Sequence, residues 1–556
     1  MSRVNTIANA SHGLDGDDAV RRNISDGVAL ADVLRTTLGP NGRDKMLVGD
    51  GQAVLTNDGA SIVDRIDIES PAATLVADVA RAQGGEIGDG STSAIVLAGT
   101  LLREAGSLLD DGFHPTTVVN GYAAAATRAQ ARLPEIATRG ERADDRLHDV
   151  VETSITGRWD AERTAFLADL AVRGYRAART GGGPRLENVT IHGIAGGGTA
   201  DSTLLDGLVI DTDRSSTSLS DVPAPLARRV EDARVAVVDH ELTIRTAASA
   251  PRLSVEDADD IRRLQEFETE EYERYVEALS AHDVDVLFCQ KSIDDRLRAL
   301  LAREGILAFE RTRQDEVHKL RRATGASPVM KLDDLDAAVV GRASVIERRS
   351  LGPSEFVLVR DEASSQVSLL LRGGTDHVVD ETERIVVDAI DLLASFDAHP
   401  GLVAGGGAAE AALAADLRTW SRGIGDRTQV AVEAFADALE TIPFTLARNA
   451  GHDPVDTVLE LRRRHDDGDA TVGIDVKTGD VTDTLARGIV EPLRLEERLV
   501  ANAAQAAATV LRIDGIIHVD EPFGGGDGHA AEDHDHDHAG GGVRSDPHGY
   551  PWAIGH

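Results

Sequence analysis

Apolar residues recur every three or four positions near both ends of the chain, which is the pattern of helices that bury one face. In the first quarter this pattern predicts helices over residues 20–34, 71–83 and 91–109. The first of these stops before Gly39-Pro40, a pair that breaks helices. After residue 380 the pattern returns, and it is clearest over residues 408–417.

The middle of the chain has a different texture. Short runs of β-branched and other apolar residues alternate there with helical patterns, which indicates a mixed α/β region. These runs are residues 189–191, 208–210, 235–238, 284–289, 306–309 and 367–371. The order helical, α/β, helical predicts one helical domain built from both chain ends, with other domains inserted between them. A length of 556 residues fits about three domains.

Composition limits the partners and the habitat. Acidic residues outnumber basic ones by 95 to 58, a net charge of −37, so nucleic acid is not expected as the main partner. Lysine is rare and arginine supplies most of the positive charge. We expect such a surface in a protein that works in concentrated salt, where the Debye length falls to about 3 Å at 1 M.

Three further features have simple interpretations. The single cysteine, Cys289, follows an apolar run and excludes an internal disulfide; a small core residue is favoured over a nucleophile. The sequence has no secretory pattern and no membrane-spanning stretch, so we expect a cytoplasmic protein without a membrane partner. Residues 524–556 are rich in Gly, Asp and His; a solvated, disordered tail is favoured over a metal site.

The hexapeptide Gly88–Ser93 carries the most chemical information. Its Gly-Asp-Gly turn places Ser91, Thr92 and Ser93 at the start of a predicted helix, where free N–H groups attract anions. Phosphate would use these groups and the hydroxyls together. Asp89 would repel phosphate unless a hard cation such as Mg²⁺ lay between them, so the turn suggests a metal–nucleotide site. An ordinary capped helix is the alternative.

Three other loops suit a nucleotide, although each is weak evidence alone. Thr37–Pro40 offers a hydroxyl and a Gly backbone after a helix. Asn57-Asp58-Gly59 presents a carboxylate, or is a simple turn. Gly405–Gly407 lets a flat ligand approach the backbone before the next helix. The chain has no Walker-type phosphate loop.

Together and in this order, these segments resemble the group II chaperonins, the thermosome and CCT subunits, over about residues 15–520. The arginine-rich, acidic bias resembles a haloarchaeal member. The matching stretches are Thr36–Val48, Leu55–Ala60, Gly88–Thr92, Thr153–Gly157, Leu287–Asp295, Leu370–Asp380, Glu383–Ala389, Val403–Glu410, Gly473–Val476, Glu491–Arg494 and Leu511–Asp514.

The resemblance implies an ATP and Mg²⁺ site. Asp89 matches the metal-binding aspartate. The residues implied to hold the nucleotide are Thr37, Leu38, Gly39 and Pro40 in the wrapping loop, Gly90, Ser91, Thr92 and Ser93 at the phosphates, and Gly406 and Glu491 at the adenosine and ribose end. The family more often has threonines where this chain has Ser91 and Ser93.

Asp58 and Asp388 match the two aspartates that orient and deprotonate the attacking water in this family. By its surroundings alone, Asp388 would be a solvent-facing residue of an otherwise apolar helix. Arg158 stands where the family often has a lysine that senses the γ-phosphate; a surface arginine is an equal alternative.

The implied fold class is an α/β multidomain chaperonin fold. It has a mainly helical equatorial domain (1–141 and 399–523), an intermediate hinge domain (142–210 and 363–398) and an α/β apical domain (211–362), followed by the tail. The apical domain would carry a helical protrusion over about residues 243–275, and residues 213–225 depart from the family pattern.

The implied function is that of an ATP-driven chaperone. The chain would be one subunit of a double ring of about 16 subunits, with other chaperonin subunits and unfolded proteins as partners. Two alternatives remain: a ring subunit or holdase with weak ATPase activity, and a metal-binding protein acting through its tail.

Overall fold

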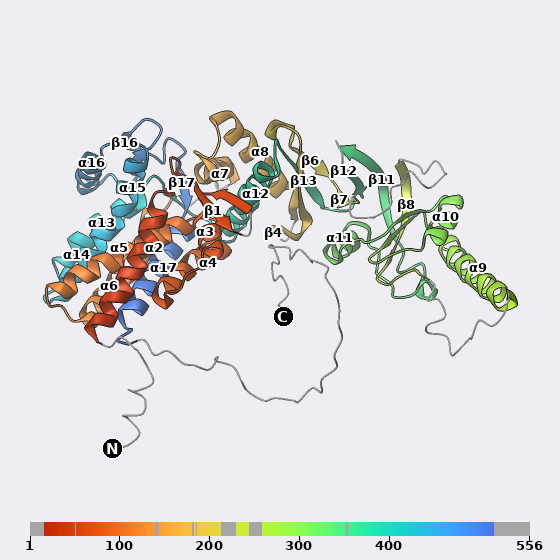
Figure 1. The fold of residues 1–556 in the computed structure, drawn as a ribbon. Helices are drawn as coiled ribbons and strands as arrows, with labels where there is room; N and C mark the ends of the chain where they lie inside the picture. Colours follow the sequence, from red (N-terminus) through yellow and green to blue (C-terminus); the bar gives the residue numbers. More distant parts are fainter. Residues whose placement is uncertain are drawn as a thin grey trace, which may run out of the picture. The chain divides into compact units, whose positions relative to one another are not determined.

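The computed structural model describes residues 16–49, 52–138, 144–180, 183–184, 186–212, 229–243, 258–351 and 354–515. The predicted tail, the divergent segment 213–225 and residues 244–257 of the predicted protrusion lie outside these ranges. Helices and strands keep the labels of Figure 1.

Helices from both ends of the chain share one hydrophobic core. Helix α17 (Leu493–Leu511) packs against α4 (Pro71–Ile87), α5 (Ser91–Asp110) and α6 (Pro115–Ile136), and α2 (Asp17–Arg35) packs on α5. Figure 1 shows the blue α17 running among these red and orange helices. The core is therefore closed by segments that lie nearly 400 positions apart in the sequence.

Small side chains allow these helices to approach closely. A methyl group added at Gly99 of α5 would lie 2.1 Å from Cβ of Ala31 on α2. Aromatic rings are few, and one pair anchors the core: Tyr122 and Phe435 meet edge to face with centroids 5.6 Å apart. The Tyr122 hydroxyl donates to the Leu101 carbonyl at 2.8 Å. Alanine and glycine thus do the packing that larger side chains do elsewhere.

Four more helices of the C-terminal region pack around this core. They are α13 (Ala408–Ser421), α14 (Thr428–Leu439), α15 (Thr441–Asn449) and α16 (Pro454–Asp466). Three two-stranded ribbons accompany the helices: β1 (Lys45–Gly49) with β2 (Gln52–Thr56), β14 (Leu402–Ala404) with β17 (Val490–Pro492), and β15 (Val472–Asp475) with β16 (Asp480–Asp483).

A three-stranded sheet carries the helix that brings Asp388 to the site. Its central strand β13 (Val367–Gly373) runs parallel to β5 (Val189–Ala195) and antiparallel to β6 (Thr203–Asp206). Helices α8 (Ala161–Ala178) and α12 (Asp376–Ala398) pack against it. The remaining helices near the site are α3 (Gly59–Arg65) and α7 (Leu147–Ile155), and a short ribbon pairs β3 (Arg179–Thr180) with β4 (Gly183–Pro184).

A six-stranded mixed sheet occupies the middle of the chain. Its order is β10 (Leu307–Phe309), β9 (Val286–Cys289), β8 (Arg229–Val238), β11 (Gly341–Leu351), β12 (Ser354–Arg360) and β7 (Leu208–Asp211). Helices α9 (Ala258–Ser280), α10 (Asp295–Arg303) and α11 (Gln314–Thr324) accompany it. Cys289 is fully buried there, and burial raises the pKa of its thiol to about 12, so it is a core residue as predicted.

Every predicted strand-like run lies on or overlaps an observed strand, and the predicted helices are present with slightly different ends. The long hairpin of β11 and β12 was not predicted. Its first strand carries Arg348 and Arg349 beside Glu347, and this run of charges hides the strand pattern. The mixed helix and strand content agrees with the predicted α/β class.

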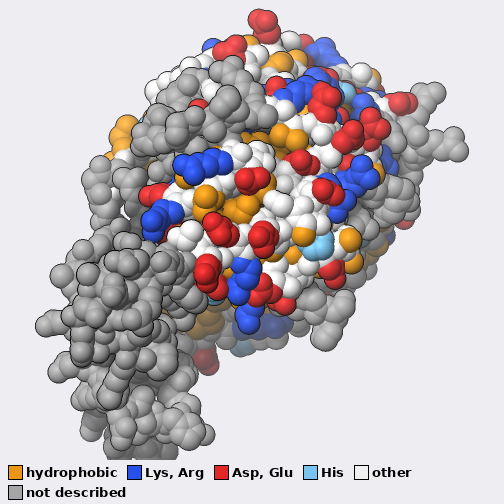
Figure 2. Space-filling model, turned by 90° about the vertical axis from the view of Figure 1, so that its right-hand side faces the viewer, with side chains coloured by type: hydrophobic (Ala, Val, Ile, Leu, Met, Phe, Trp, Pro, Cys, Tyr) orange, Lys and Arg blue, Asp and Glu red, His pale blue; other side chains and the backbone are white. Residues whose placement is uncertain are grey.

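Charged side chains of both signs are interspersed on the surface. Figure 2 shows acidic and basic side chains side by side on one face, with a hydrophobic patch between them. Arginine supplies nearly all of the described ion pairs, for example Arg103 with Asp32 at 2.7 Å. Among the described residues, no helix combines the length and the apolar character needed to cross a membrane.

Two glycines of α5 provide a test of this packing. We expect Gly99→Ala to lower the free energy of unfolding by about 1–3 kcal/mol, because its methyl group would collide with Ala31. Gly106→Ala is the matched control: its methyl group would meet only Cγ2 of Ile24, at 3.5 Å, and should leave stability unchanged or raise it by up to about 1 kcal/mol. Thermal and urea unfolding followed by circular dichroism in concentrated salt would measure both. Equal melting temperatures for the two variants would contradict the helix packing described above.

Candidate functional site

A cavity of about 430 Å³ lies where loops from several elements converge. All of the predicted nucleotide-binding residues, the predicted metal ligand Asp89 and the predicted catalytic residue Asp58 line it; Asp388 does not. The volume is in the range of small-molecule sites. The lining residues predicted from sequence are Thr37, Leu38, Gly39, Pro40, Asp58, Asp89, Gly90, Ser91, Thr92, Ser93, Gly406 and Glu491.

The Thr37–Pro40 loop follows the end of α2 and is held from two sides. The Thr37 hydroxyl donates to the Leu34 carbonyl at 2.8 Å, and Nδ2 of Asn449 donates to the Leu38 carbonyl at 2.9 Å. Gly157, with φ of +91°, approaches so closely that a Cβ there would lie 1.8 Å from the Pro40 carbonyl oxygen. A side chain at residue 157 would push this loop out of place.

The turn Gly88–Gly90 ends one helix and begins the next. Gly88 closes α4 and Gly90 opens α5, both in the left-handed conformation that favours glycine. Because Gly90 has no side chain, it cannot cap α5 in the way Ser or Asp would, and its position at the N-cap makes an ordinary capped helix the weaker interpretation. The N–H groups of Ser91 to Ser93 lie in the first turn, where an anion would bind.

Asp89 points its carboxylate into the same space. Its Oδ1 accepts the Gly90 N–H at 2.7 Å. Burial raises the pKa of Asp89, and hydrogen bonds from Ser154 and Gly90 oppose the rise. Within the described ranges, no group of three or more His, Cys, Asp and Glu side chains could hold a metal ion by itself. Asp89 fits a Mg²⁺ ion that takes its remaining ligands from phosphate and water, which is how Mg²⁺ usually binds.

Asp58 is the N-cap of α3, so Asn57–Gly59 is the start of a helix and not the simple turn that was the alternative interpretation. Its Oδ2 accepts the Ser61 N–H at 2.7 Å and its Oδ1 accepts the Ser91 hydroxyl at 3.0 Å. Burial would raise the pKa of Asp58, but the positive charge of Arg384 and the Ser61 N–H outweigh it and hold the pKa below its usual range. Asp58 is therefore an ionised carboxylate at neutral pH.

Asp388 lies at the edge of the cavity, on α12. A Cβ at Gly88 would be 2.6 Å from the Asp388 carbonyl oxygen, so α12 rests directly on the turn that carries Asp89. Leu392, one helical turn later, lines the cavity. The Asp388 side chain is 31% exposed and pairs with Arg384 at 2.7 Å. Burial raises its pKa to about 7 despite the opposing Arg384 charge.

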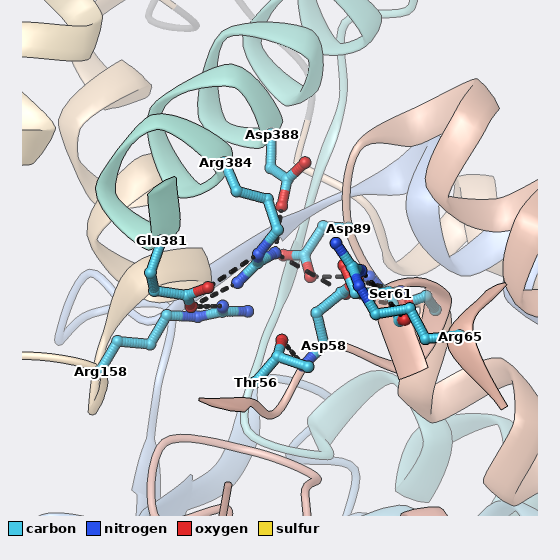
Figure 3. Close-up of polar contacts among 11 residues, drawn as sticks. Thr56, Asp58, Ser61, Arg65, Asp89, Arg158, Glu381, Arg384 and Asp388 are labelled. Carbon is cyan, nitrogen blue, oxygen red and sulfur yellow. Dashed lines mark hydrogen bonds and ion pairs between the residues drawn. The ribbon is translucent and has the colours of Figure 1, made fainter. Parts of the chain in front are cut away.

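Arg158 lines the cavity and is not an isolated surface arginine. Its guanidinium lies 3.2 Å from Oε1 of Glu381, and its side chain is 21% exposed. Figure 3 shows Arg158 and Arg384 reaching Glu381 from different elements. Whether Arg158 responds to a phosphate stays a prediction.

The opposite end of the cavity is built around glycines and buried glutamates. Gly406, with φ of +68°, lies so close to β15 that a Cβ would be 2.4 Å from the Ile474 carbonyl oxygen. Glu491 sits on β17, opposite Val403 of β14. Glu410, which also lines the cavity, and Glu496 neighbour it and are 3% and 0% exposed.

Burial raises the pKa of all three glutamates and so favours their protonated forms. Burial raises the pKa of Glu410 to about 8, and the neighbouring Glu491 adds to the rise. Burial also raises the pKa of Glu496 well above its ordinary value, with Glu410 and Glu491 adding to it. The Glu496 oxygens have no hydrogen-bond donor among the described residues. A proton shared between Glu496 and Glu491 resolves this, because a bare carboxylate would be costly there.

Sequence reasoning missed several lining residues because they are polar side chains in unremarkable contexts. Lys477 and Arg487 bring positive charge to the cavity, and Arg487 pairs with Asp475 at 2.7 Å. Ser154 also lines the cavity; it lies inside the matching stretch Thr153–Gly157, but the resemblance assigns it no role. Arg384 lies inside the matching stretch Glu383–Ala389 and Glu381 just before it; neither lines the cavity, and nothing in their spacing indicates a role.

The arrangement suits a phosphate-bearing ligand that arrives with a divalent cation. One end offers helix N–H groups, hydroxyls and Asp89; the other offers close backbone and buried carboxyl groups. Two more carboxylates, Asp58 and Asp388, stand near the phosphate end with unlike pKa values. Such unlike pairs are typical of sites that move a proton.

Comparison with known proteins identifies relatives over nearly the whole chain. The model of the TCP-1/cpn60 chaperonin family matches residues 30–521. Thermosome subunit alpha of Halobacterium salinarum is 40% identical over 93% of this chain and 92% of its own length. A thermosome subunit of Methanopyrus kandleri is 40% identical over 90% of this chain and 92% of its own. Thermosome subunit 1 of Haloferax volcanii is 38% identical over 94% of this chain and 93% of its own.

The buried glutamates predict an unusual dependence of stability on pH. Because folding raises the pKa of Glu496 above its ordinary 4.5, the folded chain keeps this proton to higher pH than the unfolded chain does. The free energy of unfolding therefore falls as the pH rises from 4.5 through the raised pKa. Glu496→Gln keeps the shape and cannot ionise, so it should melt above the wild type at about pH 8, and the gap should close toward about pH 5.

Melting temperatures across this pH range would test the expectation. Glu497→Gln is the control, because its carboxylate pairs with Arg494 at 3.3 Å instead of facing other carboxyl groups. This control should gain nothing at high pH. A Glu496→Gln variant that melts below the wild type at every pH would show that Glu496 is a stabilising anion, contrary to its surroundings.

Proposed function

Because the chain belongs to the TCP-1/cpn60 chaperonin family, as a group II chaperonin subunit that acts as a molecular chaperone, we propose that it binds and hydrolyses Mg²⁺–ATP in this cavity. The observation that carries the proposal is the convergence of the uncapped start of α5, Asp89 and Asp58 on one cavity. These residues come from different loops, and together they meet the needs of a metal-bound triphosphate.

Each end of the cavity has a separate task in this proposal. The N–H groups and hydroxyls of Ser91, Thr92 and Ser93 hold the phosphates, and the Thr37–Pro40 loop covers the nucleotide. Asp89 holds Mg²⁺, which neutralises phosphate charge when bound. Gly406 and Glu491 receive the adenosine and ribose, where the proton shared with Glu496 orients the Glu491 carboxyl group.

Hydrolysis needs a water molecule held in line with the γ-phosphate. Ionised Asp58 can orient this water, and Asp388, with a pKa of about 7, can accept its proton. The water oxygen forms a bond to the γ-phosphorus, the bond from that phosphorus to the bridging oxygen breaks, and ADP and phosphate remain. The proton passes to the Asp388 carboxylate and from there to solvent.

We assign the chain to three domains with the boundaries given above. The shared helical core supports an equatorial domain, the three-stranded sheet with α8 and α12 an intermediate domain, and the six-stranded sheet an apical domain. Asp388 lies on the intermediate part, at the edge of the cavity. Movement of that part would bring Asp388 onto the nucleotide, so hydrolysis would follow closure.

Assembly with further chaperonin subunits agrees with the exposed face of the β1–β2 hairpin. Met46 is 63% exposed, Val48 75% and Leu55 55%, and Met46 lies opposite Leu55 across the ribbon. A bare apolar ribbon of this kind needs a partner. We propose that it packs against a neighbouring subunit in a double ring of about 16 subunits, which encloses unfolded proteins in the cytoplasm.

Removing the proton acceptor tests the chemistry. Asp388→Ala should leave ATP binding intact and lower kcat by about 10²–10⁴, the usual contribution of a general base. Asp380→Ala, which removes an exposed carboxylate of the same helix, should turn over ATP at the wild-type rate. Phosphate release and nucleotide binding by calorimetry would be measured on the assembled particle. Normal turnover by Asp388→Ala would rule out its catalytic role.

Adding charge to the hairpin tests assembly. The double variant Met46→Asp, Val48→Asp should break the particle into smaller species, because carboxylates cannot be buried unpaired in an interface. The matched control Met46→Leu, Val48→Ile keeps the face apolar and should assemble. Sedimentation in concentrated salt would give the masses. A full-size particle from the aspartate variant would show that this face is not a subunit contact.

A further inference from the structure

Arg384 stands between the two aspartates assigned to hydrolysis. Its NH1 lies 2.7 Å from Oδ2 of Asp388 and 3.9 Å from Oδ1 of Asp58. Asp388 is one turn along the same helix, whereas Asp58 belongs to the loop before α3. Figure 3 shows the guanidinium placed between these carboxylates. One cation thus joins two segments that are far apart in the sequence.

Glu381 fixes the guanidinium from the other side. Nε of Arg384 donates to Oε2 of Glu381 at 3.0 Å and NH2 donates to Oε1 at 2.6 Å, a two-pronged contact that sets direction as well as distance. Arg158 also donates to Oε1 of Glu381, at 3.2 Å. The Arg384 side chain is 19% exposed. With its other edge held by Glu381, NH1 is directed at the two aspartates.

The surrounding charges explain why a cation is needed there. Asp58, Asp89 and Asp388 converge at the phosphate end of the cavity, and the positive charges of Arg384 and Arg158 lower the pKa of Asp388, which burial and the other two carboxylates raise. Without Arg384, Asp388 and Asp58 would repel one another across a poorly hydrated space. The Asp388 side chain would then be free to turn toward solvent.

Given the proposed ATPase function, we propose that Arg384 is a positioning residue for hydrolysis: it holds the Asp388 carboxylate facing Asp58 and the γ-phosphate end of the cavity. Glu381 in turn holds Arg384. This role goes beyond the two aspartates, because it assigns their mutual placement to a residue that does not line the cavity.

Another arginine of the chain has the same local pattern without the site. Arg463 on α16 pairs with Glu460 three residues before it, at 2.5 Å, and with Asp467 four residues after it, at 3.4 Å. Arg384 has Glu381 and Asp388 at the same spacings. The Arg463 pairs are solvent-exposed and involve no other segment. Arg463→Ala therefore removes the same kind of helix contacts and serves as the matched control.

Steady-state ATP hydrolysis by the assembled particle, together with calorimetric ADP binding, would test the role. Arg384→Ala should lower kcat by about 10²-fold, the cost of misplacing a reacting group by about 1 Å, with KM and ADP affinity within about threefold of wild type. Arg384→Lys should recover part of kcat, because lysine keeps the charge but loses the two-pronged contact. Arg463→Ala should match the wild type.

Several results would overturn this role. The first is a kcat of Arg384→Ala equal to that of Arg463→Ala, measured alongside a slow Asp388→Ala. This result would overturn the role of Arg384 and leave the proposed ATPase function standing. Another is a loss of ADP affinity in proportion to kcat, which would make Arg384 a binding residue. A wild type that does not hydrolyse ATP would overturn the proposed function and this role together. If Arg384→Ala fails to assemble, Glu381→Gln replaces it: a several-fold lower kcat supports the role, and an unchanged kcat opposes it.

Discussion

The site depends on one close contact: α12 rests on the turn that joins α4 to α5. At Gly88 there is no room for a side chain, since a Cβ would come within 2.6 Å of the Asp388 carbonyl oxygen. This contact brings a helix from beyond residue 375 onto the loop that carries Asp89. The carboxylates proposed to bind the metal and to accept the proton, Asp89 and Asp388, are therefore brought together at one glycine. The left-handed conformation of Gly88 and Gly90 then directs the start of α5 into the cavity.

Charge is the second constraint, and it acts differently at the two ends of the cavity. At the phosphate end, Arg384 lowers the pKa of both Asp58 and Asp388. Burial outweighs it at Asp388, whose pKa lies near 7, whereas at Asp58 Arg384 and the Ser61 N–H outweigh burial and keep the carboxyl group ionised. At the opposite end, burial and neighbouring carboxylates raise the pKa values of Glu410, Glu491 and Glu496, which favours their protonated forms. A protein with 95 acidic residues thus handles buried carboxyl groups by pairing in one place and by protonation in another.

Much of the site could be predicted because its segments, taken in order, resemble those of the group II chaperonins; each loop alone was weak evidence. The turn at Gly88–Gly90, the loop Thr37–Pro40 and the glycines at 405–407 each have a conformation set by a few neighbouring residues. The helices of the core could also be predicted, because each one shows apolar residues every three or four positions in its own sequence. Sequence could not place Arg384, because its partner Asp58 is brought near only by the fold. Glu496 was missed for the same reason: it is one acidic residue of an amphipathic helix until packing removes its solvent. The β11–β12 hairpin was not predicted because a run of charged side chains in β11 interrupts the apolar pattern that is typical of a strand.

The long-range contacts at the phosphate end of the cavity join two structural parts of the chain. Asp58 lies in the part of the chain that shares the helical core, whereas Asp388, Arg384 and Glu381 lie on α12, which packs on the three-stranded sheet. The pairing of Arg384 with Asp58 is therefore a contact between structural parts as well as between charges. Under the proposed function, a phosphate group bound near Asp58 would compete with the two aspartates for this guanidinium. Because α12 contributes Ile385, Val386 and Leu393 to the same hydrophobic core as the helices from both chain ends, any movement of α12 over the cavity would also have to repack that core.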